Sequence, residues 1–140
     1  MRQMHVLLVE DNPGDVRLTQ EAFQEAKVPA ILSVAMDGEE ALAFLEKNIR
    51  SLPDLILLDL NLPKWSGKEV LQRIKNHSEL KRIPVLILTT SKSEQDIMES
   101  YHLNANSYLL KPLDFDHFLE VVEKINAFWF QTAVLPPHHN

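Results

Sequence analysis

Apolar and polar residues alternate along the chain in blocks that fit strands and helices in turn. Short apolar runs, each with the length of a buried strand, stand at 5–10, 30–35, 55–58, 85–89 and 107–110. After each run comes a segment whose apolar residues recur every three or four positions, as they do on one face of a helix. The pattern predicts helices over 13–26, 37–47, from 66 onward, about 93–102, and 114 to about 131.

Residues suited to helix starts stand in front of these segments. Asp37 with Glu40, and Ser66 with Glu69, have the spacing of a capping box, in which each pair satisfies free backbone N–H groups. The first helix has Pro13 in its first turn, where proline is tolerated, and either of the two residues at 11–12 can cap it. These signals support the boundaries that the apolar spacing indicates.

Strands that alternate with helices indicate a particular fold class. Such chains form right-handed crossovers and a parallel sheet with helices on both faces. Five units suit the flavodoxin-like (βα)5 fold, a doubly wound α/β sheet with strand order 2-1-3-4-5, whose ligand crevice lies at the carboxyl ends of strands 1 and 3. A chain of 140 residues is long enough for one such domain. We expect the domain to span 1–131, with 132–140 as a short tail and no output domain.

Polar residues stand at the carboxyl ends of the strands that border this crevice. Strand 1 ends in Glu10 and Asp11, strand 3 in Asp59, strand 4 in Thr89, and strand 5 in Lys111. Crowded carboxylates repel one another unless a cation intervenes, and oxygen ligands in a partly solvated cleft suit Mg²⁺. A lysine and a threonine are what a phosphoryl group needs on the side away from a metal. We therefore interpret Asp59 as a nucleophile that becomes an aspartyl phosphate.

Each of these residues also has an ordinary structural explanation. Glu10 and Asp11 are favourable near the positive end of the first helix. Asp59 taken alone is more often a turn residue, Thr89 suits a strand end, and a single Lys111 is usually a solvated surface charge. The combination favours a site, because all five residues fall at carboxyl ends and at the ends of the right strands.

Composition excludes several other classes of protein. Lys and Arg total 14 and Asp and Glu total 20, so the formal net charge is −6. An acidic chain without a basic run is poorly suited to nucleic acid or to anionic lipid. The absence of cysteine excludes disulfides and thiolate metal sites. No apolar run approaches the roughly 18 residues of a membrane span, and no signal peptide is evident, so we expect a cytoplasmic protein.

Four short motifs contain these residues: "VED" at 9–11, "LLDLNLP" at 57–63, "ILTTS" at 87–91 and "YLLKP" at 108–112. Together they resemble the receiver domain of two-component response regulators, and the resemblance covers essentially the whole chain. The resemblance implies that Asp59 accepts a phosphoryl group from the phosphohistidine of a histidine kinase. It also implies that Mg²⁺ is bound by Asp11, Asp59 and the backbone carbonyl of Asn61, with Glu10 assisting through water.

The same resemblance assigns roles to residues on the side of the site away from the metal. Thr89 would hydrogen-bond the phosphoryl group, Lys111 would pair with it, and Tyr108 would be the aromatic switch. The Lys111–Pro112 peptide bond is expected to be cis. The family often has glycine where this chain has Asn104, and asparagine also suits a left-handed C-cap. An unphosphorylated receiver-like interaction module is the alternative, but it would be expected to lack Asp59, Thr89 or Lys111.

Longer stretches resemble a subgroup of the family, the single-domain regulators that pair with bacterial, chiefly cyanobacterial, phytochromes. These stretches include "VEDNPGDVRLTQEAF" at 9–23 and "FWFQTAVLP" at 128–136. The subgroup resemblance makes a phytochrome-type, light-sensing histidine kinase the expected partner.

The last predicted helix carries more apolar residues than one buried stripe requires. The stripe consists of Phe115, Phe118, Leu119, Val122, Ile125 and Trp129. Five further apolar residues have no obvious place inside the domain: Val121, Phe128, Phe130, Val134 and Leu135. They either fold back over the helix as a satellite cluster or form an exposed patch that joins a homodimer. We expect the homodimer, with or without phosphate, and the subgroup resemblance points the same way.

Overall fold

The computed structural model, which describes residues 3–137, contains one five-stranded parallel sheet in the order β2-β1-β3-β4-β5. This confirms the predicted fold class and strand order. Every strand lies within one residue of its predicted run: β1 (Met4–Val9), β2 (Ala30–Ala35), β3 (Leu55–Leu58), β4 (Val85–Thr89) and β5 (Ser107–Leu110).

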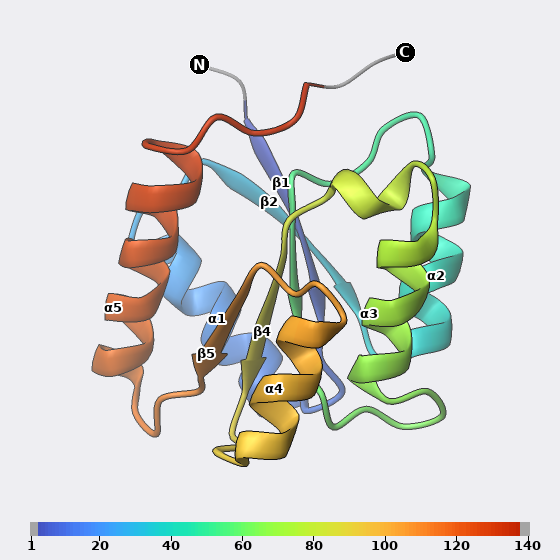
Figure 1. Ribbon diagram of the computed structural model, residues 1–140. Coiled ribbons are helices and arrows are strands. Elements are labelled where there is room, and N and C mark those ends of the chain that lie inside the picture. The colour runs from blue at the N-terminus through green and yellow to red at the C-terminus, as the bar shows by residue number, and fades with distance from the viewer. Residues whose placement is uncertain (1–2, 138–140) are drawn as a thin grey trace.

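Helices cover both faces of the sheet. In Figure 1, α1 and α5 lie on one side, and α2 and α3 lie on the other, with α4 beside α3. Their bounds are α1 (Pro13–Glu25), α2 (Gly38–Lys47), α3 (Gly67–Asn76), α4 (Glu94–His102) and α5 (Phe115–Ile125), with a short 3₁₀ turn η1 (Leu80–Arg82) before β4. None of the helices within residues 3–137 is long and apolar enough to cross a membrane.

The predicted capping residues begin their helices. The side chains of Asp37 and Ser66 accept hydrogen bonds from the backbone N–H groups three residues later. Of the two candidates at the first helix, Asn12 is the cap, because its side chain accepts from the N–H of Asp15. Asn104 follows α4 with a φ of 73°, the left-handed conformation that glycine often adopts there.

The core has two halves because successive residues of a strand point to opposite faces. On one face, Val6 and Leu8 of β1 pack with Phe118 of α5. On the other face, Leu7 and Val9 pack with apolar residues of α2 and α3. All four residues of β3 are fully buried, so the run that precedes Asp59 is a central strand covered on both faces.

The end of the last helix differs from the prediction. Regular α5 stops at Ile125, and the chain continues as a π-helical turn, η2 (Asn126–Phe130), instead of an α-helix to about residue 131. The N–H of Ala133 donates to the carbonyl of Phe128, five residues earlier, at 2.6 Å. A turn of this width rotates consecutive side chains less than an α-helix does, and Trp129 and Phe130 both pack against the core cluster of α1 and α5.

The segment after η2 crosses the end of the sheet at which the strands begin (Figure 1). Pro136 and Pro137 line a pocket there with residues that precede β3 and β4, including Leu52, Pro53 and Arg82. The described part of the predicted tail, residues 132–137, therefore lies at the opposite end of the sheet from Asp59. Residues 138–140 of that tail lie outside the described residues.

Candidate functional site

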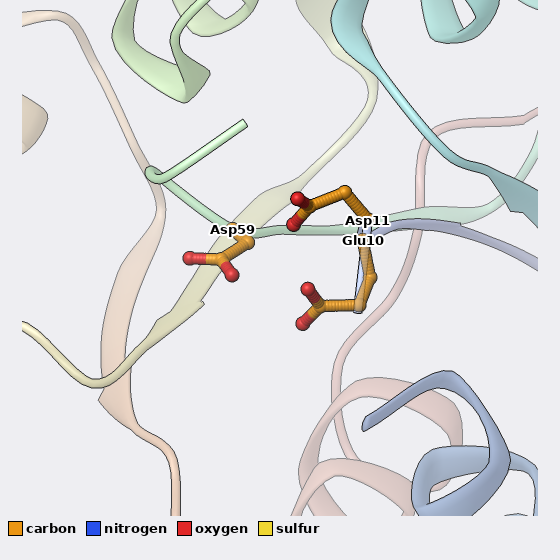
Figure 2. Close-up of side chains that lie close together, drawn as sticks. All are labelled: Glu10, Asp11 and Asp59. Carbon is orange, nitrogen blue, oxygen red and sulfur yellow. The ribbon is translucent and has the colours of Figure 1, made fainter. Parts of the chain in front are cut away.

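Three carboxylates meet at the carboxyl ends of β1 and β3. These strands are neighbours, and Val9 pairs with Leu58, so the residues that follow them, Glu10 and Asp59, emerge side by side. One carboxylate oxygen from each of Glu10, Asp11 and Asp59 lies within 4.8 Å of the others. Figure 2 shows these three side chains gathered at this edge of the sheet. The parallel pairing of β1 with β3 thus produces the cluster predicted from the strand ends.

Two of the three carboxylates are withdrawn from solvent. Glu10 and Asp59 are 3% and 6% exposed, whereas Asp11 is exposed. Burial raises the pKa of Glu10 to about 7, and the nearby charge of Asp59 acts in the same direction, while Lys111 opposes both. The cluster therefore holds its negative charge at an energetic cost, which a cation would relieve.

The ammonium of Lys111 already supplies one positive charge. Its Nζ donates to the carboxylate of Glu10, to Oδ2 of Asp59 at 2.9 Å and to Oδ2 of Asp15 at 2.8 Å. Burial by itself would lower the pKa of Lys111, but these three hydrogen bonds outweigh burial and the pKa is raised. The structure thus places the Lys111 ammonium against the Asp59 carboxylate, and its pairing with a phosphoryl group on Asp59 stays a prediction.

Sequence reasoning missed Asp15 as a member of this site. Asp15 is an acidic residue in the first turn of α1, where negative charge is usual for reasons of helix polarity alone. The available signal was topological, because α1 begins at the same edge of the sheet that carries Glu10 and Asp59.

Ser91 connects Thr89 with Tyr108. Thr89 is fully buried at the end of β4, and its hydroxyl accepts a hydrogen bond from the N–H of Ser91 at 3.4 Å. The Ser91 carbonyl accepts from the hydroxyl of Tyr108 at 2.9 Å, and the Ser91 hydroxyl donates to Asp96 of α4 at 2.6 Å. The Tyr108 ring is half-buried and packs against the core on the α2 and α3 face. The predicted hydroxyl and the predicted switch residue are therefore two hydrogen bonds apart.

This network extends to α3 through Lys68. The Lys68 ammonium contacts Asp96 at 2.5 Å and Glu99 at 2.6 Å, both on α4. Hydrogen bonds from Lys68 and then from Ser91 lower the pKa of Asp96. The start of α4 is thereby tied both to α3 and to the segment that follows Thr89.

The loop after Asp59 needs glycine at position 67. A side chain on Gly67 would overlap the backbone of Asp59 and Leu60, and the N–H of Gly67 donates to the Leu60 carbonyl at 2.8 Å. Asn61 lies next to the Asp59 carboxylate, since its N–H donates to Oδ1 of Asp59 at 3.3 Å. The position of Asp59 is therefore set by close backbone packing as well as by strand β3.

The expectation of a cis bond before Pro112 is wrong for this structure. The Lys111–Pro112 bond is trans, and no cis peptide bond occurs within residues 3–137. Trans is the lower-energy form even before proline, by roughly 0.5–1 kcal/mol. Lys111 reaches its three carboxylate partners with the bond in this form.

The five surplus apolar residues of the C-terminal region divide into two sets. Val121 and Phe130 are half-buried and pack against the core cluster of their own chain, and Leu135 is also half-buried. Phe128 and Val134 are 53% and 97% exposed. The surface that remains open is therefore smaller than the five residues together would make.

Comparison with known proteins identifies the class of this site. The family model of the response regulator receiver domain matches residues 6–123, and the chain belongs to this family. It is thus a response regulator, a signalling protein of two-component systems. The chain is 44% identical to response regulator Rcp1 of Synechocystis sp., over 94% of this chain and 92% of Rcp1.

Two solved structures show the same fold over nearly the whole chain. One is the crystal structure of the phosphorylated cyanobacterial phytochrome response regulator RcpA, which superposes with a TM-score of 0.91 over 97% of this chain and 100% of that one. The two sequences are 46% identical. The crystal structure of the Mn²⁺-bound form of Rcp1 is 43% identical, with a TM-score of 0.87 over 96% and 99%. Carboxylate oxygens at the spacing of Glu10, Asp11 and Asp59 fit a hard divalent cation in this chain too.

Proposed function

We propose that the protein is a phosphoacceptor that takes a phosphoryl group on Asp59 from a histidine kinase. One observation carries this proposal: Asp59 ends a buried central strand with two more carboxylates beside it and the Lys111 ammonium 2.9 Å from its Oδ2. Such a group has a cation partner in place, and the neighbouring carboxylates of Glu10 and Asp11 could share a divalent cation with it. The acceptor domain that we propose spans 1–131, followed by the tail 132–140, and signals by contact with another protein.

The chemistry is a transfer between two nucleophiles. An oxygen of the Asp59 carboxylate attacks phosphorus, the O–P bond forms, and the bond from phosphorus to the donor nitrogen of the kinase histidine breaks in line with it. The Lys111 ammonium offsets negative charge on the transferred group, and the buried Thr89 hydroxyl donates a hydrogen bond to it. Mg²⁺, held by Asp11, Asp59 and the Asn61 carbonyl with Glu10 through water, would supply further charge neutralisation when bound.

The partner that we propose is a phytochrome-type histidine kinase. This proposal is supported by the likeness to RcpA, which is described as a cyanobacterial phytochrome response regulator and is 46% identical over nearly the whole chain. Transfer of labelled phosphate from purified phytochrome kinases, compared with kinases of other sensory types, tests the pairing. Equal transfer rates from all of them would contradict it.

Intact-mass measurement tests the acceptor assignment. We expect the protein to gain one phosphoryl group from acetyl phosphate only when Mg²⁺ is present. The Asp59→Asn variant should gain none, because an amide is not a competent nucleophile, and Asp11→Asn should need far more Mg²⁺. Asp116→Asn, which removes an exposed acid on α5, is the matched control and should behave as wild type. Full phosphorylation of Asp59→Asn would overturn the assignment.

We further propose that Thr89 and Tyr108 transmit the modification through Ser91. When the Thr89 hydroxyl turns to a phosphoryl oxygen, the Ser91 N–H loses its acceptor, and the segment that holds the Tyr108 hydroxyl is released to move. This is a two-state shift in which the phosphoryl group favours one arrangement. The Thr89→Ala variant should still gain the phosphoryl mass but show small NMR shifts around Tyr108. Shifts as large as those of wild type would contradict the route.

Finally, we propose a homodimer formed through the last helix and the C-terminal segment, with or without phosphate. Support comes from Phe128 and Val134, which are exposed, and from Val121, Phe130 and Leu135, which are only half-buried. A two-fold axis pairs such a patch with itself. The patch lies away from Asp59, at the other end of the sheet, so a dimer would leave the acceptor accessible.

Light scattering at micromolar concentration tests the dimer. The intact chain should run near twice 16.1 kDa, and the variant Phe128→Ser with Val134→Ser should run as a folded monomer. Leu113→Ser is the control, because Leu113 is fully exposed but stands before α5, next to Asp114, which caps the start of that helix. A monomeric intact chain would contradict the dimer. The surplus apolar residues would then be explained by packing against the core of their own chain, as Val121 and Phe130 do.

A further inference from the structure

One of the three partners of Lys111 stands apart from the other two. Glu10 and Asp59 belong to the carboxylate cluster that fits a divalent cation, which among residues 3–137 consists of those two and Asp11. Asp15 is not a member of that cluster, yet its Oδ2 lies 2.8 Å from the Lys111 Nζ. The Lys111 side chain is 7% exposed and that of Asp15 is 33% exposed, so this ion pair is shielded on one side.

The backbone of Asp15 is held firmly. Its N–H donates to the Asn12 side chain at 3.1 Å, and its carbonyl accepts from the hydroxyl of Thr19 at 2.7 Å. Thr19 lies one turn further along α1 and is buried. Lys111, by contrast, follows β5 at the edge of the sheet and begins the loop to α5. The pair therefore ties the side chain of a lysine that follows an edge strand to a fixed point on a helix.

A bound cation would affect Asp15 differently from the other two partners of Lys111. A divalent cation held by Asp59 directly and by Glu10 through water would offset the charge of two of the three partners of Lys111 and would repel the ammonium itself. Asp15 keeps its full charge for Lys111, because it lies outside the cation cluster.

We infer that Asp15 is a positioning residue, which keeps the Lys111 ammonium beside Asp59 when a cation occupies the carboxylate cluster. Lys111 is then already in place as negative charge builds on the transferred group. This inference rests on the proposed function and adds a residue that acts on the acceptor only through Lys111.

Initial rates of phosphorylation by acetyl phosphate at saturating Mg²⁺ provide the first test. We expect Asp15→Ala to lower the maximal rate about three- to tenfold, with little change in the concentration of phosphodonor that gives half the maximal rate, because a displaced Lys111 affects the transition state rather than donor binding. Asp15→Glu, which restores the charge, should recover most of the rate. Glu21→Gln removes an exposed acid from the same helix and should leave the rate unchanged.

A double-mutant cycle separates positioning from a structural role. If Asp15 acts through Lys111, then Asp15→Ala has no further effect on a Lys111→Ala background. If it only shapes the first turn of α1 or the net charge of the site, the same reduction appears on both backgrounds, and the inference is overturned.

NMR of the Lys111 ammonium tests the inference without any phosphoryl transfer. In wild type, the protected ammonium signal should persist when Mg²⁺ is added, whereas in Asp15→Ala it should disappear as Mg²⁺ is added. Persistence in the variant would overturn the inference while leaving phosphorylation of Asp59 intact. A wild-type protein that is never phosphorylated would instead count against the proposed function, so the two failures are distinguishable.

Discussion

Lys75 and Lys111 are both drawn into the protein, but they meet opposite surroundings. The Lys75 ammonium, on α3, donates to the backbone carbonyls of Lys81 and Ile83 and to the side-chain oxygen of Asn106, at 2.9–3.1 Å. All three acceptors are neutral, and burial lowers the pKa of Lys75. Lys111 is surrounded by carboxylates, and its pKa is raised.

The difference teaches how the same side chain serves two purposes. Lys75 joins the η1 turn, the segment between η1 and β4, and the residue before β5, so it fastens loops at the end of the sheet away from Asp59. Lys111 forms ion pairs with Glu10, Asp15 and Asp59, and a further acid, Asp11, clusters with two of these partners. A lysine with neutral acceptors only stabilises the fold. A lysine surrounded by carboxylates has contacts that change when a cation binds to the same carboxylates.

The largest effect on stability that tests this comparison is expected for Lys111→Met. Without metal, Glu10 and Asp59 would be left buried and uncompensated, and removing one partner of such a pair costs about 3–5 kcal/mol of unfolding free energy. Because Mg²⁺ supplies the missing positive charge, much of this loss should be recovered when Mg²⁺ is present. Urea unfolding with and without Mg²⁺ measures both values. An Mg²⁺-independent loss would mean that Lys111 is as purely structural as Lys75.

A smaller and simpler loss is expected for Lys75→Met. The carbonyls of Lys81 and Ile83 would lose a donor, which costs about 1–3 kcal/mol where the groups are shielded from water. The loss should be the same with and without Mg²⁺, and phosphorylation of Asp59 should continue at the wild-type rate. Lys81→Met, which alters an exposed lysine of η1, is the control for removal of a charge. A change in Mg²⁺ dependence after Lys75→Met would contradict the separation of the two lysines.

The smallest expected effect comes from giving Lys75 a carboxylate partner, as Lys111 has. The folded pKa of Lys75 lies below its ordinary value of 10.5, so between these two pKa values the unfolded chain binds more protons than the folded chain. The Lys75 contribution to stability therefore rises with pH in that range. Asn106→Asp supplies a carboxylate and should raise the pKa of Lys75. The contribution would then be present below 10.5 and would be lost as pH rises through the raised pKa.

NMR titration of the Lys75 ammonium measures the direction of that pKa shift. Urea unfolding across alkaline pH shows whether the Lys75 contribution to the free energy of unfolding rises or falls with pH. The stability difference should be about 1 kcal/mol or less, because a partly exposed ion pair contributes little. A pKa that stays low in Asn106→Asp would show that burial, and not the type of acceptor, decides between the two lysines.

Local patterns accounted for the fold, because strand burial and helix capping are set within a few residues. The fully apolar run at 55–58 predicted a buried strand, and Asp37 and Ser66 predicted helix starts, and the structure confirms all three. The sequence also placed Glu10, Asp11 and Asp59 in one cluster, since parallel strands put their carboxyl ends at one edge.

What the sequence could not supply was the choice among partners far apart in the chain. Nothing near Lys111 indicates Asp15, which is 96 positions away, and nothing near Lys75 indicates Asn106, which is 31 positions away. The two lysines are alike in sequence and differ only in what the folded chain brings to them. The π-helical turn after Ile125 was also beyond prediction, because its width depends on how Trp129 and Phe130 both reach the core.

The junction at Ser91 has a consequence for how such a chain can evolve. Two of its four hydrogen bonds, to Thr89 and to Tyr108, are made by backbone atoms of Ser91 and are available to almost any residue at this position. The other two use the serine hydroxyl, which donates to Asp96 and accepts from the N–H of Ser93, the N-cap of α4. Position 91 can therefore drift among small side chains, which retunes how tightly α4 is held, while the connection from acceptor to aromatic ring is inherited unchanged.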